Sequence, residues 1–255
     1  DDKIIDFSVG YAKDVNLIWQ AGATQHTELL TLRSPAIKYS DWEDFLDGAY
    51  ADFKLPPMQL NLAELNIYGF KVSSPSLLIK KDGDVAEINI DSNDASGIIK
   101  FKPSNFLSMD LDKLRINSIN TDYKAVDKLE GMDYKIKAKQ LYYLDRVYDN
   151  VNVELKEKYS GYDINDLSLS WEKNKVSLKG YWQHGAKPKT YLEGYIDSDN
   201  LGDVLAGLPD FDSIKGGTGE AKFKLSWPEG LENIAVKDMR GIVSFNLANG
   251  KIYNL

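Results

Sequence analysis

The sequence predicts a mainly β protein of antiparallel strands with a few short helices. Apolar and polar residues alternate with period two along most of the chain, helical periodicity is confined to short segments, and one hairpin turn stands out. In 134–139, for example, lysines alternate with Tyr134, Ile136 and Ala138. Such alternation places apolar side chains on one face of a strand, as in antiparallel sheets that bury one face.

The same alternation returns in five later segments and is preceded by a hairpin. These later segments are 151–155, 167–171, 176–182, 221–227 and 243–247. Earlier in the chain, 77–81 and 85–90 flank the pair Asp82-Gly83. Because Asp-Gly favours the positive φ angles of a type I′ turn, we expect a tight hairpin of that type there.

Helical signals are short. Ser40 and Glu43 have capping-box spacing, so a helix is expected over about 41–51. A second begins at Asp199 and stops at 207–209, and a third covers 121–130 and ends at Gly131. Helices are thus expected to be a minor part of the fold.

The chain is expected to have three parts. Pro56-Pro57 closes a first part, 1–57, with N-terminal strands and the short helix at 41–51. The spacing of Leu65, Leu77 and Ile79 recurs at Leu141, Val153 and Leu155, which indicates a repeated β meander. We therefore expect a first meander repeat over 58–131 and a second over 132–255.

Composition excludes most catalytic and metal chemistry. The 255 residues contain no cysteine and two histidines, His26 and His184, neither of which has a second ligand at metal-binding spacing. The glycine-rich segment 215–219 lacks the Gly-Lys-Ser/Thr ending and leads into a strand, so it predicts a turn rather than a phosphate loop. We expect no enzyme activity, no metal and no cofactor.

Charge and hydropathy limit the partners. With 31 basic and 39 acidic residues the net charge is −8, which argues against nucleic acid as a partner. The longest apolar run, 141–144, is far shorter than the roughly 20 residues of a membrane helix. The chain opens Asp-Asp-Lys with no leader, so we expect it to be part of a longer product.

The predicted helices are too few to cover the predicted sheet. About a dozen strands at roughly 4.8 Å spacing would extend nearly 60 Å. Such a sheet can close into a barrel, fold into a sandwich, or stay open with an apolar trough that needs a ligand. The alternation alone leaves these alternatives open.

A series of motifs in the last third resembles a known family. The series comprises Gly180-Tyr181-Trp182, Thr190, Leu192 and Gly194, Asn200 with 201–205, Ile214 with 215–219, Leu225-Ser226-Trp227-Pro228, Arg240-Gly241, and Asn249 with 250–252. It is similar to the carboxyl-terminal region of the YhdP-like branch of the AsmA-like superfamily, which is related to TamB and to bridge-like lipid-transfer proteins. In that family glycine directly follows the Trp-Pro pair, whereas here Glu229 precedes Gly230.

The resemblance implies a fold, a function and a location. It implies a long curved antiparallel sheet of repeated meanders that forms an apolar groove. It further implies a periplasmic segment, anchored to the inner membrane through an N-terminal helix outside this chain, that carries phospholipid between the inner and outer membranes. The expected partners are phospholipid, components of both membranes and the remainder of a longer bridge protein.

The expected groove residues are the apolar members of the alternating strands. They are Ile136, Ala138, Val151, Val153, Leu155, Leu167, Leu169, Trp171, Val176, Leu178, Trp182, Phe223, Leu225, Trp227, Val243, Phe245 and Leu247. Their burial is expected to favour bound acyl chains at about 25 cal/mol per Å².

A second hypothesis remains. The 15 tyrosines and five tryptophans also suit a non-conducting periplasmic β domain that binds a protein or the cell wall.

Overall fold

The computed structural model describes residues 3–5, 16–20, 29–38, 57–67, 70–102, 105–116, 131–158, 161–183, 185, 188–205, 214–230 and 236–253. Most of these residues lie in strands, which confirms the mainly β prediction. The predicted helices at 41–51 and 121–130 and both histidines lie outside the described residues. The helix predicted from Asp199 is present as α2, Leu201–Leu205.

The strands follow one another along the chain. They are β1 (Lys3–Ile5), β2 (Asn16–Gln20), β3 (Leu29–Lys38), β4 (Met58–Ile67), β5 (Phe70–Ser73), β6 (Ser76–Asp82), β7 (Val85–Asp91), β8 (Ala95–Lys102), β9 (Phe106–Ile116), β10 (Asp133–Tyr143), β11 (Arg146–Lys158), β12 (Gly161–Trp171), β13 (Asn174–Gln183), β14 (Lys189–Ser198), β15 (Ile214–Trp227) and β16 (Arg240–Ile252). A short 3₁₀ helix, η3 (Val236–Asp238), precedes β16.

The chain forms two compact units that divide within β10. Unit 1 comprises 1–132 and 138–146, and unit 2 comprises 133–137 and 147–255. The boundaries expected at 57 and 131 stay predictions, because a division by contacts is a different criterion from the extent of a repeat.

Unit 1 is built mainly from antiparallel neighbours. Strand β4 pairs with β6, and β6 to β9 then pair in sequence order. The pair β3 and β4 is an exception to the predicted antiparallel order, because these two strands run parallel. Parallel neighbours need a crossover of a dozen or more residues, and the segment 39–57 between them is long enough.

The β6–β7 hairpin confirms the predicted position but not the predicted turn type. Asp82 pairs with Val85, so the two loop residues are Gly83 and Asp84. Gly83 has a φ of 59°, whereas Asp84 is not among the residues with positive φ. A type I′ turn needs positive φ at both positions, whereas a type II′ turn places glycine first. The type I′ prediction is therefore wrong, and the loop fits type II′.

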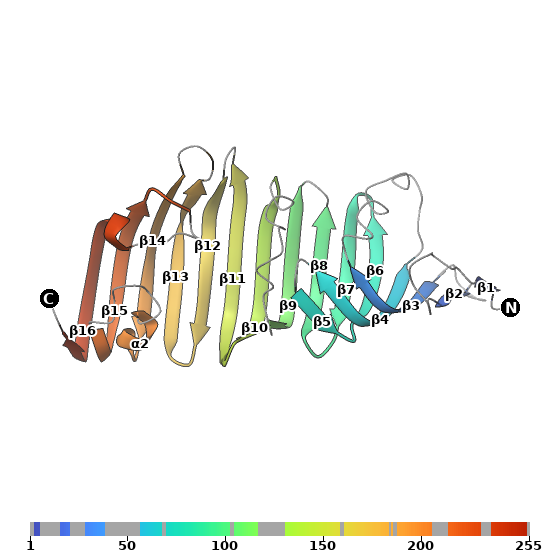
Figure 1. Ribbon diagram of the computed structural model, residues 1–255, viewed down its shortest axis with the longest axis horizontal. Coiled ribbons are helices and arrows are strands. Elements are labelled where there is room, and N and C mark those ends of the chain that lie inside the picture. Colours follow the sequence, from blue (N-terminus) through green and yellow to red (C-terminus); the bar gives the residue numbers. More distant parts are fainter. Residues whose placement is uncertain are drawn as a thin grey trace. The chain divides into compact units, whose positions relative to one another are not determined.

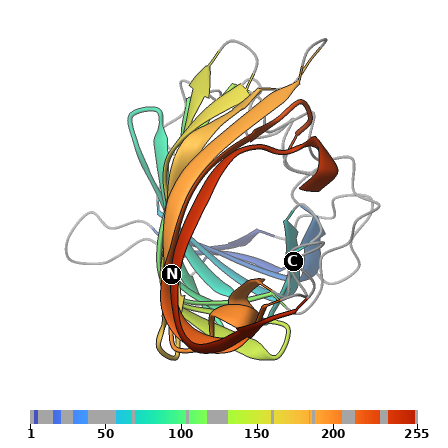
Figure 2. The same ribbon diagram turned by 90° about the vertical axis from the view of Figure 1, so that its left-hand side faces the viewer.

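Unit 2 is an open antiparallel sheet in which β11 to β16 pair in sequence order (Figure 1). Within the described residues β16 pairs only with β15, so the sheet does not close on itself there. Figure 2 shows the long strands of this unit bending strongly, with the orange helix α2 on the inner side of the bend. The sheet of unit 2 thus has a concave and a convex face.

Helix α2 packs its apolar side chains onto the concave face. Leu201 and Leu205 are buried against Ile196 of β14 and Ala221 of β15. The helix starts at Asn200, whose side-chain oxygen accepts a hydrogen bond of 3.3 Å from the backbone N–H of Asp203. This contact makes a small core in an otherwise single-layer sheet.

Leu201 is fully buried, so Leu201→Ala should lower the free energy of unfolding of unit 2 by about 2–5 kcal/mol. Urea unfolding followed by tryptophan fluorescence measures the change. The matched control is Asp203→Asn on the exposed side of the same helix, which should shift the midpoint little. Equal midpoints for both variants would contradict the packing described for α2.

Candidate functional site

The concave face of unit 2 is built from rows of side chains that cross the strands. In an antiparallel pair, directly opposed residues point to the same face, and so do residues two apart along each strand. The printed register therefore assigns each row to one face without further assumption. Four rows on the face that α2 contacts are relevant.

Each row has one residue or more per strand, in chain order. The central row is Val153, Leu167, Leu178, Gly194, Phe223 and Val243, and the leucine row is Leu155, Ile164, Gly180, Leu192, Leu225 and Gly241. The helix row is Leu169, Val176, Ile196, Ala221 and Phe245, and the tryptophan row is Tyr162, Trp182, Thr190 and Trp227.

The structure brings most of the predicted groove residues together on these rows. Trp171 and Leu247 lie on the same face beyond the helix row, opposite Asn174 and Gly219 respectively. Val151 is buried and lies two residues before Val153, next to a register shift in β11. Their contact with lipid stays a prediction.

Two predicted residues lie outside these rows. Ile136 and Ala138 are on β10, within which the two units divide, and Ala138 belongs to unit 1. Ala138 is buried, whereas Ile136 is half-buried.

The exposure of the concave face varies along its rows. Trp227 and Ala221 are 3% and 2% exposed, whereas Val243 and Phe245 on β16 are 41% and 47% exposed. The covered part of the face therefore ends between β15 and β16. Two large apolar side chains on an edge strand are left in solvent, which is typical of a surface that meets an apolar partner.

Several residues of this face were missed by the sequence analysis. Leu192, Ile196 and Ala221 continue the rows, yet Leu192 was quoted only as a motif residue. Period-two alternation along 190–196 was the available signal. Ile164 had no such signal, because it lies three residues before Leu167 and an unmatched Asn165 brings it back to the same face.

Unit 1 carries rows of the same kind that the predicted groove list omitted. One is Leu60, Leu77, Ile90, Gly97 and Leu111, and its neighbour is Met58, Ile79, Ile88, Ile99 and Met109. The four large residues of the first row are at most 9% exposed. The same alternation could have identified them from the sequence.

The convex face of unit 2 is polar and tied together across strands. Glu193 of β14 lies 3.1 Å from the Lys179 ammonium on β13 and 3.6 Å from that of Lys224 on β15. The Tyr191 hydroxyl donates a hydrogen bond of 2.8 Å to Glu193, and its ring stacks on Tyr181 at 5.6 Å. These contacts hold three neighbouring strands in register.

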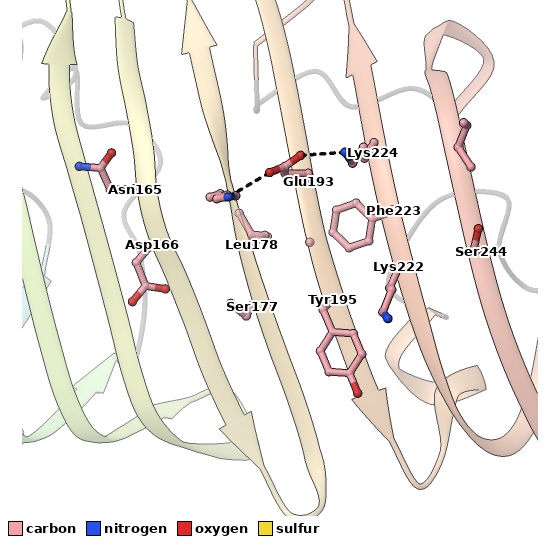
Figure 3. Close-up of a pocket in the computed structure, with 13 residues that line it drawn as sticks. Asn165, Asp166, Ser177, Leu178, Glu193, Tyr195, Lys222, Phe223, Lys224 and Ser244 are labelled. Carbon is pink, nitrogen blue, oxygen red and sulfur yellow. Dashed lines mark ion pairs between the residues drawn. The ribbon is translucent and has the colours of Figure 1, made fainter.

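A depression of about 710 Å³ lies among these side chains (Figure 3). It is lined mainly by alternate residues of the convex face, including Tyr195, Lys222 and Ser244. In the residues that the structure describes, no group of histidine, cysteine or carboxylate side chains could hold a metal ion. No helix in the described part of the chain is long and apolar enough to span a membrane.

The comparison with protein families decides the relationship. The family model described as YhdP protein matches residues 6–255. The chain belongs to the YhdP family. The match extends far beyond the motifs at 180–252, over both structural units, and confirms the resemblance. No curated protein and no solved structure matches the chain.

Electrostatics on the convex face of this YhdP-family chain give a test of its geometry. The Tyr191 hydrogen bond and, after it, Lys179 hold the pKa of the Glu193 carboxyl below its ordinary value. A depressed pKa stabilises the folded state above the unfolded-state pKa of the carboxyl, and this contribution is lost as pH falls through the folded-state value.

We predict that an NMR titration of the Glu193 side-chain carboxyl carbon gives a midpoint below that of a model peptide. Tyr191→Phe removes the largest cause and should raise the midpoint toward the ordinary carboxyl value. Tyr195→Phe is the control on the same strand and face, and should leave it unchanged. A parent-like midpoint in Tyr191→Phe would show that the hydrogen bond does not form in solution.

Proposed function

We propose that the concave apolar face binds the acyl chains of phospholipid and that the protein carries phospholipid between the inner and outer membranes. The observation that carries this proposal is the pair of unbroken apolar rows, central and leucine, across six strands of unit 2. Membership of the YhdP family, whose resemblance implies a lipid bridge, supports it.

Binding rests on apolar area rather than on specific polar contacts. Burying the exposed surface of side chains such as Val243 and Phe245 is favourable by about 25 cal/mol per Å². Because successive strands offer similar surfaces, a bound chain can move from one strand to the next with little change in free energy. This mode of transfer needs no catalytic group, cofactor or metal.

The location and partners belong to the same proposal. The chain acts in the periplasm as a segment of a longer bridge anchored in the inner membrane by a helix outside this chain. Its partners are phospholipid, components of the two membranes and the rest of the bridge, and nucleic acid is not among them. An acidic net charge of −8 supports the last point.

A cell-wall-binding function would have to use the convex face, where Tyr181, Tyr191 and Tyr195 lie. Tyr181 and Tyr191 stack on each other, and Lys189 lies 5.8 Å from the Tyr181 ring centroid. Lys222 lies 5.9 Å from that of Tyr195. These contacts compete with a sugar for the ring faces, so the convex depression favours this function less than the concave face favours lipid binding.

The proposal predicts that purified chain carries phospholipid, detected by native mass spectrometry and solvent extraction. Val153→Glu places a charge in the central row and should lower the bound lipid several-fold, because a carboxylate in hydrocarbon is costly. The control Asn152→Glu puts the same side chain on the opposite face of β11 and should retain lipid. Parent-like lipid content in Val153→Glu, with the fold intact by circular dichroism, would contradict the proposal.

A further inference from the structure

Helix α2 covers one side of the concave face. Its Leu201 and Leu205 pack on Ile196 and Ala221 of the helix row, and Val176 is packed against the same cluster. The buried Ser198 fixes the approach to the helix, because its hydroxyl accepts a hydrogen bond of 2.9 Å from the Asn200 N–H. The helix row on β13 to β15 is therefore occupied by the protein itself.

The turn at 227–230 covers the other side. The Trp227 ring N–H donates a hydrogen bond of 3.1 Å to the Gly230 carbonyl oxygen, which folds the turn back over the tryptophan row. The Thr190 hydroxyl, also on that row, donates one of 2.7 Å to the Glu229 carbonyl oxygen. Thr190 and Trp227 are 0% and 3% exposed, so the tryptophan row is closed at β14 and β15.

The central and leucine rows lie between these two covers. On β14 the helix row and the tryptophan row are represented by Ile196 and Thr190, about 20 Å apart at roughly 3.3 Å per residue. Between them are Gly194 and Leu192. Across Gly194 lies Phe223, whose ring tip would be 2.7 Å from a side chain added there, so the Phe223 ring forms the floor at this point.

The open rows offer no side-chain hydrogen-bonding group. Their members between β13 and β16 are leucine, glycine, phenylalanine and valine, while the polar groups at both covers are bonded within the protein. A peptide lying there would leave backbone N–H and C=O groups unsatisfied, at a substantial cost. A hydrocarbon chain has no such groups, so this surface suits hydrocarbon.

From these contacts we infer that α2 and the 227–230 turn are two walls that confine lipid hydrocarbon chains to the central and leucine rows, where the chains cross β13 to β16. This inference rests on the proposed function and adds the path of the lipid. The walls, rather than a polar site, then set how many hydrocarbon chains lie side by side.

Site-specific photo-crosslinking tests the path in the full chain. A small diazirine amino acid is introduced singly at Leu192 or Leu225 in the open rows, at Val176 beneath α2, and at Ser177 on the convex face as a control. The chain is incubated with vesicles of phosphatidylethanolamine and phosphatidylglycerol, irradiated and examined by mass spectrometry. We expect lipid adducts at Leu192 and Leu225 and several-fold fewer at Val176 and Ser177.

The outcomes separate the path from the function. Adducts at Val176 equal to those at Leu192 overturn the wall inference and leave lipid binding intact. Adducts at neither Leu192 nor Leu225, or equal adducts at Ser177, overturn the proposed function as well.

A second variant tests the wall directly. Leu201→Ala with Leu205→Ala loosens α2 from the sheet and should raise the adduct yield at Val176 toward that at Leu192. The control is Asp203→Asn, which should leave the yield at Val176 low. If the double variant keeps its strand content by circular dichroism and the Val176 yield stays low, α2 is not a wall.

Discussion

The structure depends on the register of its antiparallel strand pairs. Because the side-chain period of a strand is two, a slip of one residue would move a strand's apolar set to the opposite face. From β13 to β16 the pairs run without an interruption that changes the face, so Leu178, Phe223 and Val243 stay in one row. The hydrogen-bonded backbone thus converts a pattern in sequence into a continuous apolar surface.

The two faces of unit 2 are stabilised differently. On the convex face Glu193 joins Lys179 and Lys224, and exposed ion pairs of this kind are worth about 1 kcal/mol or less. On the concave face α2 supplies a second layer only near Ile196 and Ala221. Elsewhere that face has apolar side chains without a second layer of protein over β16, which is why an apolar ligand is the natural complement.

The strands and most of their faces could be predicted, because alternation is a local property. Irregular positions could not: the unmatched Asn165 keeps Ile164 on the face of Leu167, against strict alternation. The parallel pairing of β3 and β4 was also beyond local signals, because alternation in a strand does not specify its partner's direction. The turn type at Gly83 was wrong because it depends on which residues the register leaves unpaired.

By itself the sequence determined that the chain is mainly β, which side chains share a face on each regular strand, and, through its motifs, the family. Only the tertiary structure decided which apolar positions are covered and which are open. Coverage depends on contacts between distant segments, such as Thr190 with Glu229 and Leu201 with Ala221. Two apolar residues with the same period, Ala221 and Phe245, are therefore 2% and 47% exposed although they pair directly.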